Sequence, residues 1–122
     1  MHRSMIQVYV KRSDKALAFY KKAFDAKVAA SYPQPDGTFY HAELDVYGQI
    51  LALTELNDNE AAPGNTMQFC LHFGQGNEAV VRKIYGVLVE GADIRSPLGP
   101  CEFSPMMFGL IDKFGVNWCV FV

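Results

Sequence analysis

The spacing of hydrophobic and polar residues changes several times along the chain and predicts a series of short elements. Residues 5–10 are rich in β-branched and aromatic side chains, which favours a strand. Residues 15–24 repeat apolar side chains at intervals of three and four, which is typical of a helix with one buried face. That face consists of Ala16, Leu17, Phe19, Tyr20 and Phe24. We expect Ser13 or Asp14 to cap the helix, because their oxygens can accept from its first N–H groups.

Three further strands are predicted in the first half of the chain. We predict one strand at residues 27–32, and it ends at the turn-forming residues 33–37. A hairpin with strands at 38–46 and 49–56 follows. Residues 50–53 are apolar at every position, so we expect both faces of the returning strand to be covered.

The second half begins after a polar stretch at residues 57–65, which is a natural joint between two parts. A strand is predicted at 66–73 and a helix at 77–90. The apolar side of this helix consists of Val80, Val81, Ile84, Val87 and Leu88. Gly91 is expected to end the helix, because a residue without a side chain adopts a positive φ readily.

The last third of the chain alternates again between strand and turn patterns. Residues 92–96 favour a strand, and the two prolines and one glycine in 97–100 predict a turn. A final hairpin is predicted from strands 102–111 and 116–122, joined by a turn at 112–115.

The same order, strand-helix-strand-strand-strand, is therefore predicted twice. The two modules cover about residues 1–57 and 65–122, and few residues are identical between them. A length of 122 residues fits one domain, residues 1–122, because single cores usually span about 100–200 residues. The expected class is α+β, with two βαβββ modules.

Charge and cysteine content exclude several classes of function. The chain has 13 acidic and 11 basic residues and a net charge of −2, so we expect no nucleic-acid partner. No apolar run approaches the roughly 18 residues of a membrane span, so no membrane partner is expected. Cys70, Cys101 and Cys119 are an odd, widely spaced set without a zinc-ligand motif, which favours reduced thiols in a cytoplasmic protein.

Three blocks of sequence resemble a known family. They lie at residues 16–26, at 41–44 and at 112–118, where the sequence reads DKFGVNW. In this order they resemble the vicinal oxygen chelate superfamily of glyoxalases, bleomycin-resistance proteins and extradiol dioxygenases, and its PhnB-like subfamily. The resemblance implies two modules whose curled mixed sheets surround a cavity, and it implies a homodimer. Trp118 should be a core residue whose N–H needs a partner.

Metal-using members of this family hold a divalent ion on four strand positions. The resemblance places these positions at Met5 or Gln7, at Glu55, at Gln68 and at Cys119. One carboxylate with an amide, a thioether and a thiol is a poor ligand set for a hard or intermediate divalent ion. We therefore expect no metal and no other cofactor, with Glu55 and Gln68 as weak metal candidates.

Two histidines, His41 and His72, lie on predicted strands. His41 and Glu43 alternate on one strand, so they share a face, and such a pair could act as a general base. The simpler interpretation is a polar strand face that is solvated or lies in a dimer contact. His72 shares its parity with Gln68 and Cys70, and a lone histidine there is more often part of the sheet than a ligand.

Two functions are compatible with these observations. The first is a metal-free protein that binds a small organic molecule, with the candidate ligand-binding residues Gln7, Tyr9, Glu55, Gln68, His72, Met107 and Cys119. The alternative is a divalent-metal-dependent lyase or dioxygenase of the glyoxalase type. His41 and Glu43 are the catalytic candidates.

Overall fold

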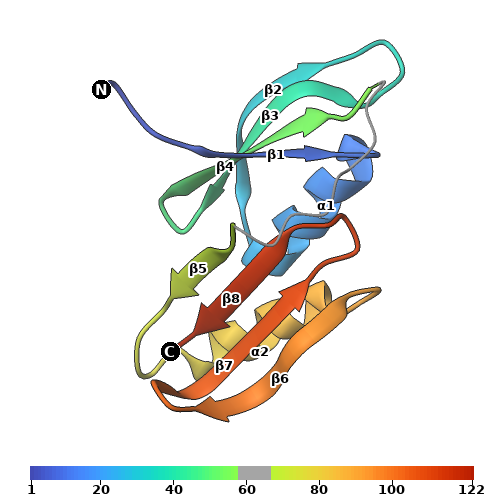
Figure 1. Ribbon diagram of the computed structural model, residues 1–122. Coiled ribbons are helices and arrows are strands. Elements are labelled where there is room, and N and C mark those ends of the chain that lie inside the picture. The colour runs from blue at the N-terminus through green and yellow to red at the C-terminus, as the bar shows by residue number, and fades with distance from the viewer. Residues whose placement is uncertain (58–66) are drawn as a thin grey trace. The chain divides into compact units, whose positions relative to one another are not determined.

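A computed structural model describes residues 1–57 and 67–122, and within them the predicted order of elements occurs twice (Figure 1). The chain divides into two compact units, Met1–Ala62 and Pro63–Val122. The repeat of strand, helix and three strands is therefore confirmed, and the class is α+β. The predicted joint at 57–65 lies, apart from Asn57, outside the described residues.

The first unit is a four-stranded mixed sheet with one helix. Its elements are β1 (Ile6–Val10), α1 (Ser13–Phe24), β2 (Lys27–Pro33), β3 (Phe39–Val46) and β4 (Gln49–Glu55). The strand order is β1-β4-β3-β2. β1 runs parallel to β4, and the other two pairings are antiparallel. This parallel pairing requires a crossover connection between the two strands, and α1, β2 and β3 form it.

Helix α1 covers one face of this sheet, against β3 and β4. Its buried side chains include Phe19, Tyr20 and Phe24, which confirms the apolar face expected from the spacing. Side chains alternate between the two faces of a strand, so the residues facing α1 can be read from the register. They include Val8, Val10, Ala42, Leu44, Leu51 and Leu53, all of which are buried.

Strand β4 is buried on both faces at its centre. Leu51, Ala52 and Leu53 are no more than 2% exposed, whereas Ile50 is half-buried. The expectation that both faces of this strand are covered is confirmed for these three residues, and α1 covers the face that carries Leu51 and Leu53.

The second unit repeats the plan. Its elements are β5 (Phe69–His72), α2 (Glu78–Leu88), β6 (Asp93–Cys101), β7 (Ser104–Ile111) and β8 (Asn117–Phe121), in the sheet order β5-β8-β7-β6. Helix α2 packs on β7 and β8 (Figure 1), where Tyr85 meets Phe108 edge to face. Its buried residues are Val81, Ile84 and Leu88, while Val80 and Val87 are half-buried. No described helix is long and apolar enough to cross a membrane.

The turn predicted at residues 97–100 is wrong. Strand β6 runs through both prolines to Cys101, and the hairpin turn to β7 comes at residues 102–103. A proline cannot donate a hydrogen bond to a neighbouring strand, but β6 is an edge strand with a neighbour on one side only. Its pairing with β7 is irregular between Ser96 and Cys101, which accommodates Pro97 and Pro100.

The turn at residues 112–115 is organised by one buried carboxylate. Asp112 accepts hydrogen bonds from the backbone N–H groups of Phe114, at 2.9 Å, and Val116, at 3.0 Å. Its other oxygen accepts the indole N–H of Trp118 at 2.8 Å, and that side chain is 2% exposed. Gly115 has a φ of +89°, which favours glycine. The DKFGVNW block is thus a folding motif, and the expected partner for the Trp118 N–H exists.

Candidate functional site

The register of the first sheet sorts the candidate residues onto two faces. Gln7 and Tyr9 on β1 pair with Ala52 and Thr54 on β4, and Ala52 pairs with Glu43 on β3. These residues share the face turned away from α1, because they alternate with the buried residues that face the helix. We call this surface the first distal face; it comprises Gln7, Tyr9, Tyr32, His41, Glu43 and Thr54.

A buried carboxylate lies on this face. Glu43 is 4% exposed and accepts two hydrogen bonds from Arg3, from Nη1 to Oε1 at 2.7 Å and from Nη2 to Oε2 at 2.9 Å. His41 Nε2 lies 2.8 Å from Oε2 of the same group. The hydrogen bonds from Arg3 and then from His41 lower the pKa of Glu43 to about 2. Glu43 is therefore ionised at neutral pH and holds both neighbours.

This contact selects the tautomer of the His41 ring. An ionised carboxylate can only accept, so Nε2 must carry the hydrogen that lies between it and Glu43. In the neutral ring, Nδ1 is then the unprotonated nitrogen and can accept a hydrogen bond or a proton. The contact with Glu43 thus orients the His41 ring on the first distal face.

Two exposed tyrosines belong to the same face, one on each edge strand. Tyr9 on β1 is 57% exposed and Tyr32 on β2 is 58% exposed. Gln7 Nε2 donates to the Tyr9 hydroxyl at 2.9 Å, and the Tyr32 ring lies 6.1 Å from the His41 ring. Aromatic rings with polar tips offer both contact area and hydrogen bonds to a ligand.

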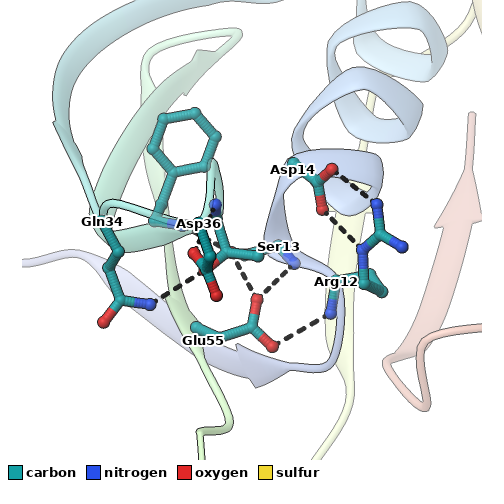
Figure 2. Close-up of polar contacts among 8 residues, drawn as sticks. Arg12, Ser13, Asp14, Gln34, Asp36 and Glu55 are labelled. Atoms are coloured by element: carbon teal, nitrogen blue, oxygen red, sulfur yellow. Dashed lines mark hydrogen bonds and ion pairs between the residues drawn. The ribbon is translucent and has the colours of Figure 1, made fainter.

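Glu55 lies on the opposite face and has a different role (Figure 2). Its Oε2 accepts the backbone N–H of Arg12 at 3.0 Å, and its Oε1 accepts the N–H of Ser13 at 2.8 Å and the Ser13 hydroxyl at 2.7 Å. The side chains of Ser13 and Asp14 do not cap α1, so that expectation is wrong. Arg12 precedes the helix at a φ of +57°, and the carboxylate of Glu55 supplies the cap from β4.

The other candidates gather on the second sheet, on the face turned away from α2. Cys70 and His72 pair with Cys119 and Phe121, and Phe121 pairs with Met107. We call these five residues the second distal face. Gln68 precedes β5 in the same parity and donates to Asn117 Oδ1 at 3.2 Å. The expected common direction of Gln68, Cys70 and His72 agrees with this register.

Aromatic rings dominate one end of the second distal face. His72 stacks on Phe121 with ring centroids 4.6 Å apart, and Phe103 meets the same ring edge to face at 5.2 Å. Sulfur atoms of Met107 and Cys119 share the face. Burial raises the pKa of Cys119 to about 11, with a further contribution from Cys70, so this thiol stays protonated at neutral pH.

These donors do not fit the divalent ion that the family resemblance implies. Both oxygens of Glu55 bind the start of α1, and both oxygens of Glu43 bind Arg3. The remaining positions offer Gln7, Gln68 and a protonated Cys119, which are weak ligands for such an ion. Within residues 1–57 and 67–122, no three His, Cys, Asp or Glu side chains come close enough to hold a metal.

Two parts of these surfaces could not be anticipated. Arg3 precedes the first strand, and its place in the sequence gives no sign that it binds Glu43, 40 residues away. The ring cluster of His72, Phe103 and Phe121 joins three segments of the second unit. The parity of His72 with Cys70 and of Phe121 with Cys119 is visible in the sequence, whereas nothing in the sequence indicates that Phe103 joins them.

Comparison with solved structures gives the same fold. Protein PA1353 from Pseudomonas aeruginosa has a TM-score of 0.83 at 19% identity, covering 99% of this chain and 97% of that one. The PhnB protein from Bacillus cereus has a TM-score of 0.80 at 21% identity, covering 98% of each chain. The fosfomycin resistance protein FosX from Listeria monocytogenes, solved as its E126Q mutant with Mn(II) and 1S,2S-dihydroxypropylphosphonic acid, has a TM-score of 0.67 at 14% identity. It covers 98% of this chain and 87% of its own.

Comparison with curated protein sequences gives no match. A family model does match, over residues 3–120, and this range spans nearly all of both modules. The order of elements and the sheet topology agree with that assignment. The chain belongs to the Glyoxalase/Bleomycin resistance protein/Dioxygenase superfamily.

Proposed function

We propose that this protein binds a small organic molecule on its first distal face without a metal ion. The observation that carries the proposal is the Arg3–Glu43–His41 cluster, in which a buried, ionised carboxylate orients a histidine. A structural ion pair would need no histidine, and a solvated strand face would not bury the carboxylate. The fitting ligand has a hydrogen-bond donor for His41 and a flat or apolar part for the neighbouring Tyr32 ring.

Chemical-shift mapping tests this proposal with simple probes. Phenol, benzamide and cyclohexanol are titrated into the uniformly ¹⁵N-labelled chain, and we expect saturable shifts centred on Tyr32 and His41. His41→Phe should weaken binding of the probes that donate a hydrogen bond, while His72→Phe, on the second distal face, serves as the matched control. Shifts that do not saturate, or that His72→Phe weakens equally, would contradict the proposal.

A proton-transfer enzyme is the second candidate function, and the oriented His41 favours it. In that case the Nδ1 atom would take a proton from a carbon or oxygen acid bound beside Tyr32. Hydrogen exchange from the α-carbon of a ketone such as acetophenone in D₂O, followed by NMR, tests it. Exchange that the chain accelerates and that His41→Gln abolishes would support the enzyme.

The divalent-metal-dependent lyase or dioxygenase stays the competing hypothesis. Elemental analysis after dialysis, followed by titration with zinc, manganese and iron(II), distinguishes it. Near-stoichiometric metal that is lost in Glu55→Ala or Gln68→Ala would support the metal enzyme and overturn our proposal. We expect the dialysed chain to bind no metal stoichiometrically.

We also propose that the protein is a cytoplasmic homodimer. Family membership supports the dimer, and large side chains such as Ile94 and Phe103 are exposed on the second unit. The three cysteines are free, which agrees with a reducing compartment. Light scattering at micromolar concentration in ordinary salt tests the dimer, and a monomer mass would overturn it.

A further inference from the structure

Two of the three cysteines occupy neighbouring positions in the second sheet. Cys70 on β5 and Cys119 on β8 are register partners in a parallel pair, so their Cβ atoms point to the same side. Neighbouring strands lie about 4.7–4.9 Å apart, and disulfides form between Cα atoms about 4.4–6.8 Å apart. The backbone therefore already holds the two residues at a bridging separation.

The third cysteine, Cys101, makes a smaller electrostatic contribution to Cys119 and is not a register partner of either residue of this pair. The register partner of Cys119 on its other side is Gly109, which places no side chain beside the thiol. Cys70 is the side chain next to Cys119, and the two thiols interact. Cys101 ends β6, which is two strands away from β8 in the sheet, and it pairs with Ser104.

We propose that Cys70 and Cys119 form a vicinal dithiol that small disulfides convert into an intrachain disulfide. This modification site does not depend on the proposed ligand-binding function. It would join the edge strand β5, which is only four residues long, covalently to its neighbour β8. A short edge strand can also shift slightly to reach the final geometry of the bridge.

The chemistry proceeds in two exchanges. The Cys70 thiolate attacks one sulfur of a small disulfide, the S–S bond of that disulfide breaks, and one small thiolate leaves and takes up a proton. The Cys119 sulfur then loses its proton to the solvent and attacks the Cys70 sulfur of the mixed disulfide. The second small thiol leaves, so two protein thiols are oxidised and one small disulfide is reduced to two thiols.

Exposure assigns the order of these steps. Cys70 is exposed and reachable from solvent, whereas Cys119 is 9% exposed. Burial raises the pKa of Cys119, so its thiol does not react with a dissolved disulfide on its own. It reacts with the sulfur that its neighbour has brought next to it. Cys70 is thus the attacking residue and Cys119 the resolving residue.

Intact-mass spectrometry tests the proposal on the full chain. The reduced protein is treated with oxidised glutathione at neutral pH, and its remaining thiols are alkylated. We expect the loss of two hydrogen atoms, one alkylated thiol, and a peptide map that joins Cys70 to Cys119. Cys101→Ser is the matched control and should lose the same mass. Cys70→Ser should not, and Cys119→Ser should stop at the glutathione adduct of Cys70.

A second measurement does not depend on oxidation. Phenylarsine oxide binds two adjacent thiols at once, and we expect one equivalent on the wild type and on Cys101→Ser, and none on Cys70→Ser. In denaturant, glutathione treatment should join the three cysteines without preference. Bridges to Cys101 in the folded chain, disulfide-linked dimers as the main product, or arsenical binding that persists in Cys70→Ser would each overturn the proposal.

Discussion

Replacing Glu55 tests whether one carboxylate from β4 holds the start of α1. In Glu55→Ala, the N–H groups of Arg12 and Ser13 and the Ser13 hydroxyl all lose their acceptor. Ser13 is fully buried, so water cannot replace the carboxylate at two of these donors. A buried donor left unpaired costs about 1–3 kcal/mol, and a lost helix cap costs about 0.5–2 kcal/mol. We therefore expect a destabilisation of about 3–4 kcal/mol.

Glu55→Gln provides the graded comparison. An amide keeps one oxygen that can accept, but its NH₂ group meets donors, so about half of the loss is expected. Glu102→Ala, which removes an exposed carboxylate in a turn, is the control and should change the free energy of unfolding by less than about 0.5 kcal/mol. Urea unfolding followed by far-UV circular dichroism measures all three variants.

Two outcomes of the unfolding measurements would contradict the role of Glu55 as a helix cap. If Glu55→Ala unfolds within about 0.5 kcal/mol of the wild type, the carboxylate does not cap the helix. If Glu55→Gln is as stable as the wild type while Glu55→Ala is not, the effect comes from packing, because an amide preserves shape but not the acceptor set.

Three further predictions concern the core, the last turn and acid stability. Phe19→Ala and Trp118→Ala should each lower the free energy of unfolding by roughly 3–5 kcal/mol, and near-native urea midpoints would contradict their core positions. Asp112→Asn should remove the acceptor of the Trp118 indole N–H, which costs about 1–3 kcal/mol. The fluorescence emission of the single tryptophan should shift as well, and unchanged emission and stability would count against the contact. The pKa of Glu43 is lowered to about 2 in the folded chain. Its contribution to the free energy of unfolding is therefore complete above its ordinary pKa and is lost as pH falls from about 5 towards 2. Between pH 7 and pH 3, the free energy of unfolding should therefore fall less in Glu43→Gln than in the wild type. An equal fall in both proteins would show that the ionised Glu43 contributes nothing to stability.

The order of elements could be predicted because it follows from local periodicity. The spacing in residues 15–24 and the alternation around the hairpins depend on which faces are buried, and burial dominates the choice of side chain. The core role of Trp118 followed from a similar argument, since a large ring with one N–H must be buried beside an acceptor.

The errors arise where a residue's role depends on distant partners. Residues 97–100 look like a turn, but Pro97 and Pro100 cost little on an edge strand, and only the sheet order reveals that β6 is at the edge. Ser13 looks like a helix cap, yet its hydroxyl donates to Glu55, 42 residues later in the chain.

The candidate site could be predicted in part for the same reason. The parity of His41 with Glu43 is local, and the register agrees with it. The clamp from Arg3 and the opposite placement of Glu55 and Gln7 are tertiary facts. Gln7 and Glu55 lie on opposite faces of the sheet, and the alternation along each strand shows this only once the pairing of β1 with β4 is known.

The distance along the chain between α1 and its cap has a consequence for synthesis on the ribosome. Helix α1 is translated first, but the carboxylate that completes its first turn arrives 42 residues later, with the last residue of β4. A nascent chain that ends before β4 carries an uncapped helix and a sheet that lacks one of its two central strands. The first module is thus expected to fold in a single late step during translation, when its final residue emerges, and not helix first.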